Sequence, residues 1–522
     1  MTSNANLYAH FKQHFPAKLD TELLLTADGR SVSYAEADQS SARLAGCLLQ
    51  LGAVAGDRVT VQVEKSVENL FLYLACLRAG LVYHPLNTAY TAAELEYFLG
   101  NAEPTIVVCA SASLTTIKSV LPKEGSEGNS VKAVLTLDSD GRGSLMQQLI
   151  ATSTDDVDAL VAQCDGSEMA ALLYSSGTTG RPKGIMLSHD NLRKNAETLV
   201  DAWAFSASDR LLHMLPIYHV HGLFVGISCV LMSGASMSWH STYSDKVAVA
   251  NMPNCTVMMG VPTYYTRLLS NPDFGPECCV NMRLFVSGSA PLLAETFVEF
   301  EQRCGHTILE RYGMSETNMN TSNPLLGERR AGTVGPALPG VSIRVVDDNG
   351  TCLAGGEIGN LQVQGSNVFS GYWRMPEKTA EDFTSDGFFN TGDKATIDPD
   401  GYVSIVGRAK DLIICGGLNV YPKEVELVVD DIAGIKESAI IGVPHADFGE
   451  AVIAVVVLEP SANEESSAKQ ELPTSAEIIA HCKTLLANFK VPKRVEVVDA
   501  LPRNAMGKVQ KNVLRERFQS SL

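Results

Sequence analysis

The sequence lacks the marks of several common protein classes. Its twelve cysteines include no Cys-x-x-Cys pair, which argues against a zinc site or a disulfide framework and favours reduced, mostly buried thiols. Its formal net charge is −18, and an acidic chain repels phosphate backbones, so nucleic acid is not an expected partner. Residues 1–20 contain neither an apolar signal core nor an Arg-rich amphipathic pattern.

Long apolar runs are also missing. The run 222–239, which has no charged residue and no histidine, contains several Ser and Gly and is typical of a buried helix rather than a membrane span. We therefore expect a cytoplasmic protein that has no membrane partner.

The 522 residues are too many for one hydrophobic core and enough for two or three domains. Helical and strand patterns alternate over 31–110 and again over 168–310, which predicts two packed α/β subdomains. Short glycine-rich strands over 330–408 predict a small β-rich subdomain. We predict an α/β fold with a large N-terminal domain, 1–409, followed by a small mobile α+β domain, 410–522.

The segment "YSSGTTGRPKG" (174–184) directly follows an apolar strand. It offers backbone N–H groups, hydroxyls and the cation of Lys183, which are the groups that a polyphosphate needs. It is not a Walker A loop, because Lys183 is followed by Gly184. A flexible linker seldom comes directly after a buried strand, so the pattern favours a phosphate-binding loop.

This loop resembles the signature of the adenylate-forming superfamily, which includes the acyl-CoA synthetases. The superfamily's other motifs follow in order: "SGSAPL" (287–292), "ERYGMSET" (310–317), "NTGD" (390–393), "GRAKDLI" (407–413) and "LPRNAMGKVQK" (501–511). The resemblance therefore covers nearly the whole chain. "PLNTAYT" (85–91), "LPIYHVHGLFV" (215–225) and "GVPTYYTRLL" (260–269) further resemble the malonyl-CoA synthetase family.

The resemblance implies a two-step ligation that uses ATP, CoA and Mg²⁺. A carboxylate first attacks the α-phosphate of ATP, and the CoA thiol then displaces AMP from the acyl-adenylate. Malonate would be the acid. A ligase for another small acid such as methylmalonate, and an adenylating enzyme that loads a carrier protein, are the alternatives. We expect a monomer or a homodimer.

The resemblance also implies a nucleotide site. Tyr312 would lie against the adenine, Asp393 would accept from the ribose hydroxyls, and Glu316 would hold Mg²⁺. The implied ATP-binding residues are Ser175, Ser176, Gly177, Thr178, Thr179, Gly180, Lys183, Ser289, Ala290, Pro291, Glu310, Arg311, Tyr312, Gly313, Met314, Ser315, Asp393, Arg408 and Lys508.

Catalysis and domain movement are implied by the same resemblance. Lys508 would reach the α-phosphate and the carboxylate, and His219 and Glu316 complete the expected catalytic set. Lys410 would act as the hinge about which the small domain turns between the two steps. The expected CoA contacts are Gly416, Gly417 and Leu418. The two glycines have no side chains and would let the pantetheine arm pass close to the backbone.

A malonate pocket needs groups for the second carboxylate, because burying an unpaired anion is costly. Arg267 is the first candidate, since its guanidinium suits a carboxylate, although it could also be a helix-surface arginine. Ser287 is a possible donor, and Arg283 is a weaker candidate that could be structural.

His219 and His221 stand two apart in "PIYHVHGLF", and in an extended segment both rings would point to one side. They could be a metal pair, core residues or the lining of a substrate pocket. No Asp, Glu or Cys is close in sequence, and magnesium has little affinity for imidazole. The metal pair is therefore disfavoured, and the resemblance implies that both histidines line the acyl pocket, with His221 as the more selective of the two.

Overall fold

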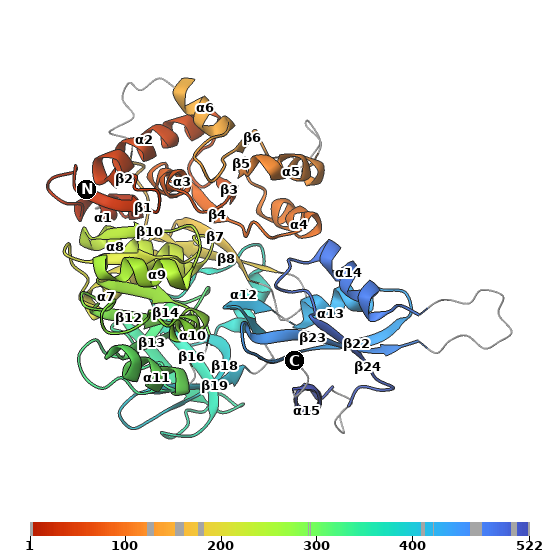
Figure 1. The fold of residues 1–522 in the computed structure, drawn as a ribbon. Helices are drawn as coiled ribbons and strands as arrows, with labels where there is room; N and C mark the ends of the chain where they lie inside the picture. The colour runs from red at the N-terminus through yellow and green to blue at the C-terminus, as the bar shows by residue number, and fades with distance from the viewer. Residues whose placement is uncertain are drawn as a thin grey trace. The chain divides into compact units, whose positions relative to one another are not determined.

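The computed structural model describes residues 4–122, 130–151, 161–175, 182–290, 292, 294–408, 413–420, 422–459, 472–502 and 509–519 (Figure 1). The chain is a mixed α/β protein that forms two compact units. The first comprises Met1–Thr88, Leu99–Leu173 and Gly184–Val406, and the second comprises Ala89–Phe98, Tyr174–Lys183 and Gly407–Leu522. The domain boundary predicted at 409–410 stays a prediction, because residues 409–412 lie outside the described part.

One large sheet, most of whose residues belong to the first unit, is mainly parallel. In spatial order it contains β17 (Gly371–Tyr372), β8 (Lys183–Ser188), β7 (Met169–Ser175), β4 (Val82–Pro85), β3 (Arg58–Gln62), β5 (Ile106–Cys109) and β6 (Ala133–Thr136). Helix α3 (Val67–Arg78) follows β3 and is buried along its whole length. It begins at Ser66, whose side chain accepts from the backbone N–H of Asn69 and so satisfies an otherwise unpaired donor.

The second large sheet positions most of the predicted motifs. Its order is β14 (Asn318–Ser322), β13 (Ile308–Met314), β12 (Leu284–Ser287), β11 (Val257–Gly260), β9 (Arg210–His213), β10 (Ser236–Trp239), β1 (Glu22–Thr26) and β2 (Ser31–Ser33). The strands from β13 to β1 run parallel to their neighbours. Strands β11 and β12 are buried and nearly continuous in apolar residues, as expected for parallel strands that are covered on both faces.

A smaller antiparallel sheet follows in the chain. It contains β15 (Val341–Val346), β16 (Gly359–Gly365), β18 (Phe389–Ile397) and β19 (Val403–Arg408). This sheet accounts for the short glycine-rich strands that the sequence predicted over 330–408.

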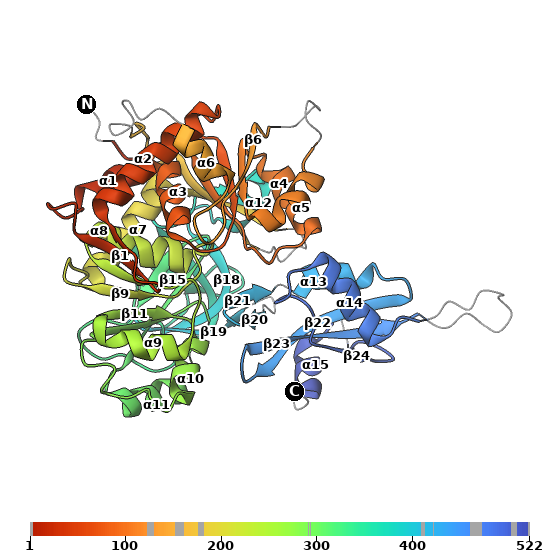
Figure 2. The same ribbon diagram turned by 45° about the horizontal axis from the view of Figure 1, so that its top comes forward.

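The second unit is built around another mainly antiparallel sheet. Strands β21 (Leu418–Val420), β20 (Ile413–Cys415), β23 (Gly449–Leu458) and β22 (Ile435–His445) lie in this order, and β24 (Arg494–Val497) pairs with β23. Figure 2 shows α13 (Pro422–Asp430) and α14 (Ser475–Leu485) on one face and α15 (Lys511–Phe518) on the other. Alternate residues of β22 and β23 supply the two apolar faces that these helices cover.

Two expectations from composition can be compared with the structure. All twelve cysteines are free, and all except Cys352 are buried. Within the described ranges, no helix is both long and apolar enough to cross a membrane. The run 222–239 is instead divided among the π-helix η2 (His221–Ile227), helix α8 (Ser228–Ser233) and strand β10.

Candidate active site

The predicted motifs meet where three parallel strands of the second sheet end. Ser287 at the end of β12 is paired in register with Gly260 of β11 and with Glu310 of β13. The carboxyl ends of parallel strands are the usual place for ligands in open α/β sheets. The structure therefore brings "SGSAPL" and "ERYGMSET" together at the edge where a ligand is expected.

Tyr312 and Asp393 form one side of this region. The Tyr312 hydroxyl donates to Oδ2 of Asp393 across 2.5 Å. Asp393 is buried, and its backbone N–H donates to the Thr391 hydroxyl across 3.1 Å. A buried carboxylate fixed in this way is suited to accept hydrogen bonds from a diol.

Glu316 lies in the tight turn between β13 and β14, and it is buried. Its carbonyl accepts from the backbone N–H of Phe369 across 2.7 Å, and the next carbonyl, that of Thr317, accepts from the Asn367 amide across 2.7 Å. Asn318 adopts a positive φ of 50°, which the hairpin requires. The backbone of this turn is therefore held by hydrogen bonds from Asn367 and Phe369.

Glu310 connects β13 to the loop that carries Ser289. Its Oε1 accepts from the backbone N–H of Leu292 across 3.3 Å. Burial raises the pKa of Glu310 to about 7. Ser289 itself has a φ of 71°, an uncommon conformation for a residue with a side chain, so the loop has a defined and strained shape.

Arg311 is a buried cation with unpartnered donors. It is 3% exposed, and its Nε and Nη2 atoms have no hydrogen-bond partner among the residues that the structure describes. Burial lowers the pKa of Arg311 to about 10, which leaves the guanidinium charged at neutral pH. A buried charge of this kind is costly unless an anion pairs with it.

The side chain of Arg311 lies on the face of β13 opposite those of Glu310 and Tyr312, because successive side chains of a strand alternate. It packs against the backbone of Gly288, where an added Cβ would lie 2.3 Å from Cζ of Arg311. Sequence reasoning placed Arg311 with the nucleotide residues. The alternation in "ILERYGM" places its side chain on the other face of the strand from Tyr312, and its role in ATP binding stays a prediction.

His219 and His221 lie close enough to Arg311 for its charge to act on both. Burial first, and the Arg311 charge second, lower the pKa of each imidazole. Both rings are therefore neutral at neutral pH. The Nδ1 atom of His221 lies 3.3 Å from the Ser289 hydroxyl, and its buried Nε2 has no partner in the described part of the chain.

The segment that carries the two histidines is not extended. His219 lies in a turn, and His221 begins η2, so the same-side argument for a strand does not apply. Helical segments of the π type are frequent at functional sites. Across the described ranges, no group of three or more His, Cys, Asp or Glu side chains could hold a metal ion.

Arg267 and Arg283 lie in different surroundings from Arg311. Arg267 is exposed on the last turn of α10 (Pro262–Ser270). Arg283 directly precedes β12, and it donates to both carboxylate oxygens of Asp209, at 2.7 and 2.8 Å, and to the Trp203 and Ala204 carbonyls. Its guanidinium is thus engaged in an ion pair at the start of the strand.

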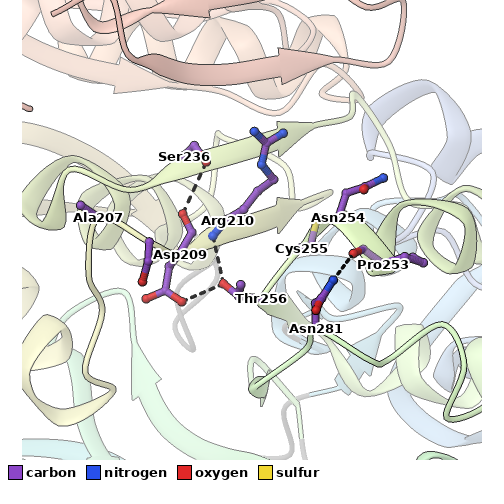
Figure 3. Close-up of a pocket in the computed structure, with 10 residues that line it drawn as sticks. Ala207, Asp209, Arg210, Ser236, Pro253, Asn254, Cys255, Thr256 and Asn281 are labelled. Atoms are coloured by element: carbon purple, nitrogen blue, oxygen red, sulfur yellow. Dashed lines mark hydrogen bonds between the residues drawn. The ribbon is translucent and has the colours of Figure 1, made fainter. Parts of the chain in front are cut away.

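A surface hollow lies where β9, β10 and β11 begin, at the opposite end of the sheet from the strand ends where the motifs meet (Figure 3). Its lining includes Asp209, Arg210 and Thr256, and these residues bond to one another: the Thr256 hydroxyl donates to Oδ1 of Asp209 and accepts from the backbone N–H of Arg210. Asn281 likewise donates to the Pro253 carbonyl across 2.7 Å. These contacts support the beginnings of β9 and β11, away from the strand ends where the motifs meet.

The remaining predicted residues are placed in part. Ser287 is fully buried at the end of β12, and its hydroxyl has no partner among the described residues. Ser175 ends β7, Lys183 begins β8 and is buried, and Arg408 ends β19. The predicted residues Ser176, Gly177, Thr178, Thr179, Gly180, Pro291, Lys410 and Lys508 lie outside the described residues.

The predicted CoA contacts form the turn between β20 and β21. Gly416 and Gly417 have φ values of 59° and 78°, a conformation that glycine adopts without strain, and Leu418 begins β21. Glycine is therefore required at this turn for its backbone shape, whatever else passes beside it.

Comparison with known proteins places this geometry in context. Residues 11–373 match the family described as AMP-binding enzyme, and residues 424–508 match its C-terminal domain. A malonate–CoA ligase of Arabidopsis thaliana is 32% identical, covering 95% of this chain and 86% of the relative. A long-chain-fatty-acid–CoA ligase, FadD13 of Mycobacterium tuberculosis, is 30% identical, covering 94% of each.

Among solved structures, ATP-bound MatB from Rhodopseudomonas palustris is similar over 99% of both chains. Its sequence is 50% identical, and the TM-score is 0.76.

Proposed function

The chain belongs to the AMP-binding enzyme family, and we propose that it joins malonate to coenzyme A in an ATP-dependent, AMP-forming reaction. A malonate oxygen attacks the α-phosphorus, and the bond to diphosphate breaks. The CoA sulfur then attacks the acyl carbon of malonyl-adenylate, AMP leaves, and the thiol proton is released. The relatives include a malonate ligase and a long-chain fatty-acid ligase, so family membership alone leaves the acid open.

The choice of acid rests on the buried guanidinium of Arg311, whose Nε and Nη2 atoms have no hydrogen-bond partner among the described residues. A pocket for a long apolar chain has no anion with which to pair this charge, and the charge would remain buried at a cost of several kcal/mol. The distal carboxylate of malonate supplies that anion and suits a guanidinium fork. We therefore assign Arg311 to the acid rather than to ATP.

Neutral donors complete the proposed carboxylate site. His221 is neutral, and when Ser289 donates to its Nδ1, the Nε2 proton is left for the substrate. The Ser287 hydroxyl is a further donor. His219, which lies just before η2, would line the acyl-binding site. Arg267 is exposed on a helix turn, so any contact that it makes with the acid would be made from the surface.

The nucleotide roles rest on the family resemblance and on the Tyr312–Asp393 contact. Tyr312 would lie against the adenine, and Asp393 would accept from the ribose. Glu316 is a buried oxygen donor, which fits Mg²⁺, a cation that keeps phosphate and water as its other ligands. Mg²⁺ there would neutralise charge on the phosphates.

The second unit would provide a different set of residues for each of the two reaction steps. Lys508 would stabilise charge at the α-phosphate during adenylation. The turn at Gly416 and Gly417 would border the pantetheine arm during thioester formation, after rotation about Lys410. A monomeric or homodimeric state and a cytoplasmic location stay predictions.

The test compares Arg311→Met with Arg267→Ala. Loss of the buried cation in Arg311→Met should lower kcat/KM for malonate about 100-fold or more and leave the Kd for ATP within about threefold. A larger malonate-specific loss in Arg267→Ala would contradict the Arg311 assignment. If neither substitution lowers kcat/KM for malonate more than kcat/KM for propanoate, the malonate proposal fails.

A further inference from the structure

Lys65 is a buried lysine that the proposed reaction does not use. It lies between β3 and α3 and is 7% exposed. Its Nζ atom donates to the carbonyls of His213 and Leu215, at 2.9 and 3.0 Å, and lies 2.7 Å from Nδ1 of His213. It also lies 4.3 Å from the centre of the Trp239 ring.

These contacts match an ammonium group. Two carbonyls and one imidazole nitrogen provide three acceptors for its three N–H bonds, and the aromatic face attracts its charge. Within the described residues, no carboxylate lies within ion-pair distance of Nζ, and burial lowers the pKa of Lys65 well below its usual range. The amine of Lys65 is therefore held by contacts with the segment that leads to the two histidines, and not by a counter-ion in the described part of the chain.

The next contact passes through His213. Because its Nδ1 accepts from Lys65, its Nε2 carries the proton and donates to the Gly222 carbonyl across 2.9 Å. Gly222 follows His221 in the first turn of η2. This turn is tightly packed, since a Cβ at Gly222 would lie 2.1 Å from the Pro216 carbonyl oxygen.

We propose that Lys65 is a positioning residue for the acid pocket. Through the imidazole of His213 it holds the Gly222 carbonyl and thus the first turn of η2, which sets His221 beside Arg311. Its direct bond to the Leu215 carbonyl holds the start of the turn that carries His219. This inference rests on the proposed function, because it concerns the same carboxylate site.

The primary test is Lys65→Met, which keeps an unbranched side chain and removes the donors. The ratio of kcat/KM for malonate to that for propanoate should fall about tenfold or more, mainly through KM for malonate, while KM for ATP changes less than about twofold. An equal loss for both acids would show a merely structural role and overturn the proposal. An unchanged ratio would also overturn it.

Variants at His213 test whether Lys65 acts through this imidazole, a path that we call the relay. They do so even if Lys65→Met does not fold. His213→Gln retains an oxygen to accept from Lys65 and an N–H to donate to Gly222, so it should keep most of the malonate preference. His213→Leu retains neither and should lose it. Equal ratios in these two variants would contradict the relay.

A double-mutant cycle gives a second, independent readout. If Lys65 acts through His213, the loss in Lys65→Met/His213→Leu should be no larger than the greater single loss, whereas additive losses would contradict the relay. Lys132→Met is the matched control, because Lys132 is exposed and its Nζ atom donates to the Gly52 carbonyl. If the wild-type protein shows no malonate preference, the proposed function fails rather than the relay alone.

Discussion

The backbone of Gly288 closes one face of the Arg311 guanidinium, so closely that a Cβ at residue 288 would lie 2.3 Å from Cζ of Arg311. This contact joins the first residues of "SGSAPL" to β13. It also explains why residue 288 is glycine, since any side chain would occupy the place of the cation.

Gly288→Ala should therefore displace the guanidinium without removing its charge. We expect kcat/KM for malonate to fall about tenfold or more, because a displaced fork no longer meets the carboxylate. Steady-state kinetics with malonate and propanoate would measure this. Gly100→Ala is the matched control, since a Cβ there meets nothing within 4 Å. A Gly288→Ala enzyme with unchanged malonate kinetics would contradict the assigned position of the carboxylate.

Tyr312→Phe should affect the nucleotide rather than the acid. The substitution removes the hydroxyl that donates to Asp393 and leaves a buried carboxylate with one partner fewer. We expect the Kd for ATP, measured by calorimetry, to rise about three- to tenfold, while KM for malonate changes less than about twofold. A selective effect on malonate would mean that Tyr312 faces the acid.

Glu310 should make stability depend on pH. Its pKa is raised from 4.5 to about 7 by burial, so between these values the unfolded chain releases a proton that the folded protein retains. Stability is therefore lost as pH rises from 4.5 to about 7, by about 3 kcal/mol for this group. Glu310→Gln has no such proton.

The thermal midpoint of Glu310→Gln relative to wild type should therefore increase between about pH 5 and about pH 8. Differential scanning calorimetry at the two pH values measures the difference directly. A constant difference in midpoint would show that Glu310 ionises normally in the folded protein.

Lys508→Ala should separate the two half-reactions. Adenylate formation, followed as diphosphate release, should be lost because the charge at the α-phosphate is no longer stabilised. Premade malonyl-adenylate should still react with CoA at a rate close to that of wild type. Loss of both half-reactions would count against the alternation of the small domain.

The alternation of helical and strand patterns predicted the α/β architecture with a small second unit, and the family resemblance implied that the motif residues form one site. The sequence could not predict that Arg311 rather than Arg267 is the buried arginine, because burial depends on which elements pack together. The ion pair of Arg283 with Asp209 spans 74 residues, and it joins two segments that no local pattern connects. The π-helix that begins at His221 likewise contacts a residue of another element, because His213 bonds the Gly222 carbonyl.

The most direct test of the malonate account is CoA-dependent AMP formation by the wild-type protein with malonate, methylmalonate, acetate and octanoate in parallel. The buried cation of Arg311 predicts that kcat/KM for malonate exceeds that for acetate and octanoate by about 100-fold or more. A malonate value no higher than that for acetate, or a preference for octanoate, would contradict it.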